Sequence, residues 1–226
     1  MKLDFFECRF CDKRYNTAAG LKRHKCPSKE RADFCLETKY GKTAFEAYCI
    51  WVRMRGYVKP ELEACVDSKY FTSFVKFSRF FYESSIPLLQ NYIEFMVEKD
   101  FLPQLWSHPE VYSQYITSFD SRVDLMEQAK ITLTYIDAVA AKVGITNEEL
   151  FGVMTTHEMV KMIRSRRFSP TVLYLMKSYH RYLVECTESD AAILQSMVPE
   201  TTINRKLAKN PKTKEMLRGI IKQYEL

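Results

Sequence analysis

"FECRFCDKRYNTAAGLKRHKCP", residues 6–27, gathers metal-ligating side chains in a stretch too short for a hydrophobic core of its own. Cys8 and Cys11 are separated by two residues, as in the turn of a short hairpin, and His24 follows farther on. Two thiolates from a hairpin and one imidazole from a helix make three corners of a tetrahedral zinc site. The sequence therefore predicts a hairpin and a helix over roughly residues 4–25, folded around one Zn²⁺ ion.

The fourth ligand is an open question, because only Lys25 separates His24 from Cys26. Side chains two positions apart on a helix point to nearly opposite sides, so both cannot face one ion while the helix continues. Pro27 favours extended backbone at the residue before it. We expect the helix to end at about His24, so that Cys26 swings back as the ligand. Cys35 is the alternative, and it would require the segment after Pro27 to fold over the site.

This stretch resembles a zinc finger of the two-cysteine, two-histidine type, in a variant whose final ligand is a cysteine. The pattern is carried by Phe6, Cys8, Cys11, Tyr15, Leu21 and His24. The resemblance implies that Tyr15 and Leu21 form the small apolar core. It also implies that base contacts would come from the positions of Thr17, Gly20 and Arg23, of which only Arg23 could make a bidentate contact with guanine. Sequence-specific reading by this finger is therefore expected to be poor.

Basic residues gather in three parts of the chain, although the net charge is only +6. Residues 1–35 hold nine Lys and Arg against five Asp and Glu, residues 161–167 hold four basic residues and no acid, and residues 205–226 hold seven against two. Most charge runs are solvated faces, but clusters of this kind also bind phosphates. We expect contacts to the backbone of nucleic acid, DNA in preference to RNA, from Arg9, Lys13, Arg14, Lys22, Arg23 and Lys25 and from Arg164, Arg166 and Arg167.

Composition indicates a folded protein of the cell interior. Hydrophobic residues make up 46% of the chain and charged residues 27%, which is typical of globular domains. No run of 18 apolar residues occurs, and the first residues lack the features of a signal peptide. Seven cysteines, three of them in the metal-like cluster, favour metal binding over disulfides. We expect a cytoplasmic protein without a membrane partner.

Beyond the finger, the sequence predicts one helix after another and no convincing strand, so we expect a mainly α fold. A polar link, "PSKERADF" at residues 27–34, is expected between the finger and the body. The predicted domains are a zinc finger with its link over residues 1–35 and an α-helical domain over residues 36–226. Aromatic residues at helical spacing within residues 70–82 predict a buried helix face rather than a base-stacking surface.

Capping residues set the expected bounds of the later helices. A long helix is expected to be capped by Asp120 or Ser121 and to end at Gly144. Residues 146–149 form a capping box that predicts the start of the next helix. Another continuous helix is expected over residues 169–186, where a proline occupies the first turn. The basic residues just before it would lie near a helix N-terminus, which attracts phosphate.

Catalytic motifs are missing from the sequence. "YGKTAF" at residues 40–45 contains the Gly-Lys-Thr of a phosphate-binding loop, but Leu36 stands where that loop requires its first glycine. "THEM" at residues 156–159 lacks the second histidine of a zinc protease. We therefore predict no catalytic residue, and a nucleotide- or base-modifying enzyme is the least favoured of the functions considered.

Two further stretches, "KYFTSFVKFSRFFYESSIPLLQNYIEFMVEKDFLPQLW" at residues 69–106 and "RSRRFSPTVLYL" at residues 164–175, resemble helical zinc-finger proteins of tailed bacteriophages. The resemblance implies a phage origin and a place in the host cytoplasm, in DNA replication or transcription, and it supplies no catalytic residues. We expect a zinc-binding, nucleic-acid-binding accessory protein. The alternative is an adaptor whose finger docks a replication or transcription enzyme.

Overall fold

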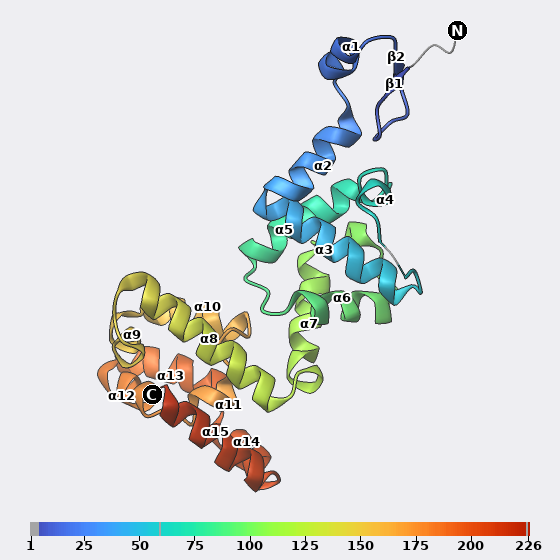
Figure 1. The fold of residues 1–226 in the computed structure, drawn as a ribbon. Helices are drawn as coiled ribbons and strands as arrows, with labels where there is room; N and C mark the ends of the chain where they lie inside the picture. The colour runs from blue at the N-terminus through green and yellow to red at the C-terminus, as the bar shows by residue number, and fades with distance from the viewer. Residues whose placement is uncertain (1–4, 59, 225) are drawn as a thin grey trace. The chain divides into compact units, whose positions relative to one another are not determined.

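The computed structural model describes residues 5–58, 60–224 and 226, and these residues are mainly helical. A two-stranded antiparallel sheet at the N-terminal end is followed by helices only, which confirms the expected fold class (Figure 1). None of the described helices is both long enough and apolar enough to cross a membrane.

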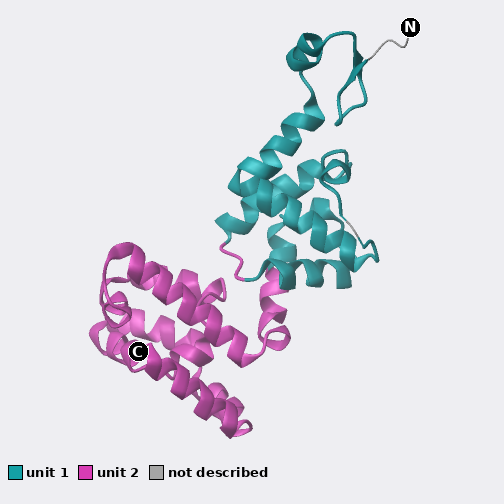
Figure 2. Ribbon diagram, in the orientation of Figure 1, with its two compact units in different colours: residues 1–84, 88–112 teal, residues 85–87, 113–226 magenta. Residues whose placement is uncertain are grey.

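The described chain forms two compact units (Figure 2). The first runs up to Ser84 and also includes Leu88–Tyr112, and the second comprises Ser85–Pro87 and Ser113–Leu226. The predicted division into residues 1–35 and 36–226 stays a prediction.

The first unit contains the hairpin and the helices that follow it. Phe6 pairs with Tyr15 across the hairpin, and Glu7 pairs with Arg14. In chain order the elements are β1 (Phe6–Glu7), β2 (Arg14–Tyr15), α1 (Ala18–Arg23), α2 (Pro27–Glu37), α3 (Lys39–Met54), α4 (Leu62–Val66), α5 (Phe71–Glu83), α6 (Leu89–Glu98), a 3₁₀ turn η1 (Pro103–Leu105) and the first residues of α7 (Pro109–Arg122).

The segment expected as a polar link is helical. Residues 27–34 belong to α2, with Pro27 in the first turn, where the missing N–H of proline costs nothing. Arg31 holds this helix in place, because its guanidinium donates to the carbonyl oxygen of Val66 at 2.8 Å and lies 5.1 Å from the ring centre of Phe71. The charged residues of the segment are the solvent-facing side of a packed helix.

The Gly-Lys-Thr stretch at residues 41–43 has a packing role. Thr38 caps α3: its hydroxyl accepts from the backbone N–H of Gly41 at 2.9 Å and donates to the carbonyl oxygen of Phe34 at 2.9 Å. Gly41 is buried against the backbone at the end of α2, and an added Cβ atom would stand 2.7 Å from Cα of Cys35 and closer still to the carbonyl of Phe34. Glycine is required here because α2 and α3 meet backbone to backbone.

Aromatic rings form the core of the first unit. Phe77 on α5 stacks on Tyr92 of α6 at 5.4 Å between ring centres and meets Trp106 edge to face at 5.2 Å. Phe74 and Phe77 are fully buried, which confirms that the aromatic helix is a core helix. The indole N–H of Trp106 donates to the carbonyl of Phe101 at 2.9 Å, so the polar edge of the ring is satisfied inside the core.

The second unit is helical throughout its described residues. Its elements are the rest of α7, α8 (Leu125–Val143), α9 (Asn147–Val153), α10 (Thr156–Arg164), α11 (Pro170–Leu173), α12 (Lys177–Glu185), α13 (Glu188–Met197), α14 (Glu200–Ala208) and α15 (Pro211–Gln223). Its hydrophobic core joins residues from α8 to the end of the described chain, including Ile136, Phe168, Leu194 and Leu217.

Caps explain several boundaries of this unit. The expected cap of the long helix at Asp120 or Ser121 is wrong, because both residues belong to α7. Asp124 caps α8 instead, with its carboxylate accepting from the backbone N–H groups of Met126 and Glu127 at 2.8 and 3.0 Å. Gly144 ends α8 with a φ of 80°, as expected of a glycine C-cap.

Two capping boxes begin the next helices. The expected box of Thr146 and Glu149 starts α9 and is confirmed. A second box starts α10, where the backbone N–H of Thr155 donates to the carboxylate of Glu158 at 2.9 Å. That hydrogen bond holds the pKa of Glu158 below its usual value. The "THEM" stretch is therefore a helix start.

The prediction of one helix over residues 169–186 is wrong, because the structure has two helices there, α11 and α12. The backbone is extended at Met176, and the ring Nε2 of His180 lies 2.8 Å from the carbonyl oxygen of Tyr174. Leu173, before the break, and Met176, at the break, are both fully buried.

Candidate metal centre

The hairpin positions the first two cysteines. The backbone N–H of Asp12 donates to the carbonyl oxygen of Cys8 at 2.8 Å, and the N–H of Cys8 donates to that of Lys13 at 2.9 Å. Asp12 has a φ of 54°, in the left-handed region that aspartate tolerates. This tight turn brings the thiols of Cys8 and Cys11 to one side of the hairpin.

The short helix α1 positions the histidine. Thr17 caps it, with its hydroxyl accepting from the backbone N–H of Gly20 at 3.0 Å. The helix ends at Arg23, and both His24 (ψ 119°) and Cys26 (φ −116°, ψ 109°) have extended backbone. The expected end of the helix at His24 is thus confirmed. Because the backbone is extended from there, the side chains of His24 and Cys26 can face the same side.

Four side chains converge at this point. The sulfurs of Cys8, Cys11 and Cys26 and a ring nitrogen of His24 all lie within 4.8 Å of one another. The sulfurs of Cys8 and Cys26 are 3.8 Å apart, and the sulfur of Cys11 is 3.1 Å from Nε2 of His24. Cys8 and Cys26 are buried, and the other two are half-buried. This group could hold a metal ion.

The donor set fits a closed four-ligand site. Metal–sulfur bonds of about 2.3 Å at tetrahedral angles place two sulfurs about 3.8 Å apart, which is the spacing of Cys8 and Cys26. A backbone hydrogen bond from Phe10 is the main factor that lowers the pKa of the Cys8 thiol, and a thiolate is the form that binds metal. The ring of Tyr15 lies 5.1 Å from that of His24 and shields the imidazole.

Cys35 lies outside this group. Cys35 is nine positions after Cys26, all the residues between them belong to α2, and a rise of nine helical positions spans about 13 Å. The thiol of Cys35 is buried and hydrogen-bonded with that of Cys65, an interaction that lowers the pKa of Cys35. The alternative ligand therefore has another partner in the helical part of the first unit.

The basic residues of the finger are all exposed: Arg9, Lys13, Arg14, Lys22, Arg23 and Lys25. Arg14 has an acidic partner, Glu7, at 3.6 Å, in a pair whose side chains are largely exposed. The guanidinium of Arg9 lies 4.6 Å from the ring centre of Phe10. Nε of Arg23 donates a long hydrogen bond of 3.4 Å to the carbonyl of Ala19.

The three arginines before α11 differ in their surroundings. Arg166 is half-buried and pairs with Asp120 at 3.1 Å. Arg167 donates from Nε to the carbonyl of Ser85 at 2.9 Å and lies 4.7 Å from the ring centre of Tyr135. Arg164 is exposed. Two of the three predicted phosphate contacts are therefore engaged in holding the second unit together. The helix that follows them, α11, is only one turn long, so the expected attraction of phosphate by a long helix does not apply.

Comparison with known proteins supplies no relative: no family model, no curated protein and no solved structure matches this chain. The metal centre and the exposed basic residues around it are therefore the features from which a function can be inferred.

Proposed function

We propose that this chain is a zinc-binding, nucleic-acid-binding accessory protein, in which a metal-stabilised finger contacts the phosphate backbone. The observation that carries the proposal is the combination of a closed cysteine and histidine cluster with six exposed basic side chains within residues 5–26, a stretch that holds only two acidic ones. From the sequence resemblance we also propose a phage origin and a role in DNA replication or transcription.

Zinc is the proposed metal because of the donor set. Three thiols and one imidazole are typical of structural zinc sites, whereas carboxylate and carbonyl oxygens suit magnesium or calcium. One ion would be coordinated by four protein ligands, Cys8, Cys11, His24 and Cys26, so no coordination position would stay open for a substrate. The role of the ion is then to fold the finger.

Phosphates are the proposed ligands because the reading face of the finger is poor. Gly20 has no side chain, and the hydroxyl of Thr17 is occupied as the cap of α1. Only Arg23 remains of the three positions that read bases. The exposed cations lie on both the hairpin and the helix end, so they can neutralise several phosphates without regard to sequence.

Reversing two of these charges tests the proposal. The double variant Lys22→Glu, Arg23→Glu is expected to weaken binding to mixed-sequence DNA by at least about tenfold at 0.1 M salt and to lower the slope of log K against log salt by about two. Fluorescence anisotropy of a labelled duplex and a labelled single strand over a salt series measures both quantities. Both residues are exposed, so the metal content is expected to stay at that of the parent.

The matched control is Lys130→Glu with Lys142→Glu, which makes the same change in net charge on exposed positions of α8. Its DNA affinity is expected to stay within about twofold of the parent. Equal losses in the two double variants would mean that net charge alone governs binding. Arg164→Glu tests the second patch, since Arg166 and Arg167 hold the fold.

The adaptor is the alternative function, and one observation favours it. Phe5 and Phe6 are 49% and 42% exposed, and such large aromatic side chains on the surface are common at protein interfaces. An adaptor predicts that the Lys22→Glu, Arg23→Glu variant binds DNA as the parent does, while Phe5→Ser with Phe6→Ser loses a co-purifying protein.

A further inference from the structure

A broad hollow of about 920 Å³ opens on the second unit, among α12, α14 and α15. Five basic side chains line it: Lys177, Arg181, Lys214, Arg218 and Lys222. Glu148 is the one acidic side chain among its described lining residues. Three of the seven basic residues at positions 205–226 thus lie together with two from α12, which the sequence did not indicate.

The basic side chains share two helix faces. Lys214, Arg218 and Lys222 are four residues apart on α15, so successive ones are neighbours on the same side of that helix. Lys177 and Arg181 have the same spacing on α12. Like charges at this spacing repel one another and destabilise the helix. An anion in the hollow would remove that repulsion.

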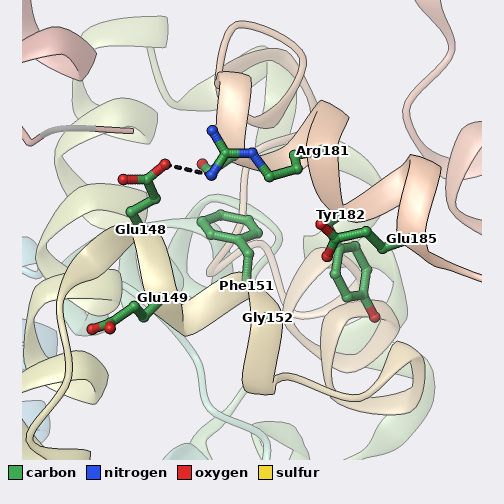
Figure 3. A pocket seen from close by; sticks show the side chains of 8 residues that line it. Glu148, Glu149, Phe151, Gly152, Arg181, Tyr182 and Glu185 are labelled. Atoms are coloured by element: carbon green, nitrogen blue, oxygen red, sulfur yellow. Dashed lines mark hydrogen bonds and ion pairs between the residues drawn. The ribbon is translucent and has the colours of Figure 1, made fainter.

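Acidic partners are scarce around these cations. In the described part of the chain, Lys177, Lys214, Arg218 and Lys222 form no ion pair, and only Arg181 does, with Glu148. Figure 3 shows this pair from a second, smaller hollow of about 390 Å³, whose other acidic residues are Glu149 and Glu185. Arg181 and Glu148 line both hollows; the smaller hollow has two further acidic lining residues, and the larger one has four further basic ones.

Ser178 adds a polar group to the same wall. The residue is 4% exposed and lines both hollows, and its buried hydroxyl oxygen has no hydrogen-bond partner among the described residues. The hydroxyl of Tyr174, another lining residue, accepts from Asn204 and donates to Glu200, both at 2.9 Å.

We propose that the basic hollow binds a phosphate-bearing anion, either a free nucleotide or the backbone of a nucleic-acid strand. Its volume is that of a small-molecule site, and Lys and Arg side chains are the usual partners of phosphate oxygens. The site uses residues of the second unit alone. It is therefore independent of the metal centre and of the phosphate contacts proposed for the finger.

Neutralising the α15 face tests the proposal. Arg218→Gln with Lys222→Gln is expected to weaken binding of at least one of three probes by about tenfold or more. The probes are inorganic pyrophosphate and ATP without divalent metal, both by calorimetric titration, and a labelled mixed-sequence 12-mer single strand by anisotropy. Leu217 and Ile221, which bury α15 in the core, are unchanged, so the far-UV circular dichroism should match the parent.

The matched control is Lys209→Gln with Lys212→Gln, which removes two charges from exposed positions nearby that do not line the hollow. Its binding is expected to stay within about twofold of the parent. In the opposite direction, Glu148→Gln frees Arg181 and is expected to tighten binding by about threefold or more. The two effects together would separate a local site from general attraction by positive charge.

The probes also identify the source of the phosphate. Binding of ATP and pyrophosphate that the α15 variant weakens indicates a nucleotide. Loss of 12-mer affinity in the α15 variant, with no binding of the two small probes, indicates a strand. Binding of pyrophosphate and ATP should persist in the Lys22→Glu, Arg23→Glu variant. When the α15 and finger substitutions are combined in one protein, their losses of 12-mer affinity should add. The two sites are thus tested separately, and failure of either proposal leaves the other standing. The hollow is not a phosphate site if no probe binds the parent, or if the α15 variant and its control weaken binding equally.

Discussion

Gly41→Ala is expected to destabilise the first unit by about 3 kcal/mol. In most helices this replacement stabilises, because alanine loses less conformational entropy on folding. Here the new methyl group would stand 2.7 Å from Cα of Cys35 and nearer to the carbonyl of Phe34, where only backbone can give way. The helices α2 and α3 would have to separate, and the Thr38 cap that joins them would be strained.

Urea unfolding followed by tryptophan fluorescence measures this effect directly. Trp51 and Trp106 are the two tryptophans of the chain, and both lie in the first unit. The matched control is Gly219→Ala on α15, where nothing lies within 4 Å of the added methyl group. That control is expected to leave the tryptophan transition unchanged, and to stabilise the second unit by about 0.5–1 kcal/mol as followed by far-UV circular dichroism. An unchanged tryptophan transition in Gly41→Ala would show that the two helices do not meet backbone to backbone.

Cys26→Ser is expected to lower zinc affinity by at least about two powers of ten. Structural zinc sites bind with about 10–16 kcal/mol, so one of four ligands contributes on the order of 3 kcal/mol. Because the finger buries little besides its ligands, it should lose its structure with the ion, while the helical body keeps its own. Competition with a chromophoric chelator gives the affinity, and metal analysis gives the stoichiometry, expected to fall from one ion per chain to none after dialysis against chelator.

Cys35→Ser is the control for the same measurement. Its thiol contacts Cys65 and not the cluster, so zinc affinity should match the parent. A modest loss of stability is expected, since a buried hydroxyl replaces a thiol. If Cys35→Ser loses zinc and Cys26→Ser keeps it, the ligand set proposed from the geometry is wrong.

The sequence alone predicted the group of four side chains that the structure brings together. These candidate ligands, the turn and the helix end lie within about twenty consecutive residues, so local spacing and the effect of Pro27 on the residue before it were enough to favour Cys26 as the fourth one. The mainly α fold and the capping box at Thr146 followed from equally local patterns. A second box at Thr155 carried the same pattern in the sequence.

Tertiary packing decided what local patterns left open. Gly41 occurs in a stretch that suggests a nucleotide loop, and only the contact with Phe34 shows why a side chain is excluded there. The break between α11 and α12 falls at Met176, where no glycine or proline marks it in the sequence. The basic hollow joins residues of α12 and α15 that lie more than thirty positions apart in the chain. Helical spacing gives each helix its charged face, but which two faces meet depends on how the apolar sides pack, and that is a property of the whole unit.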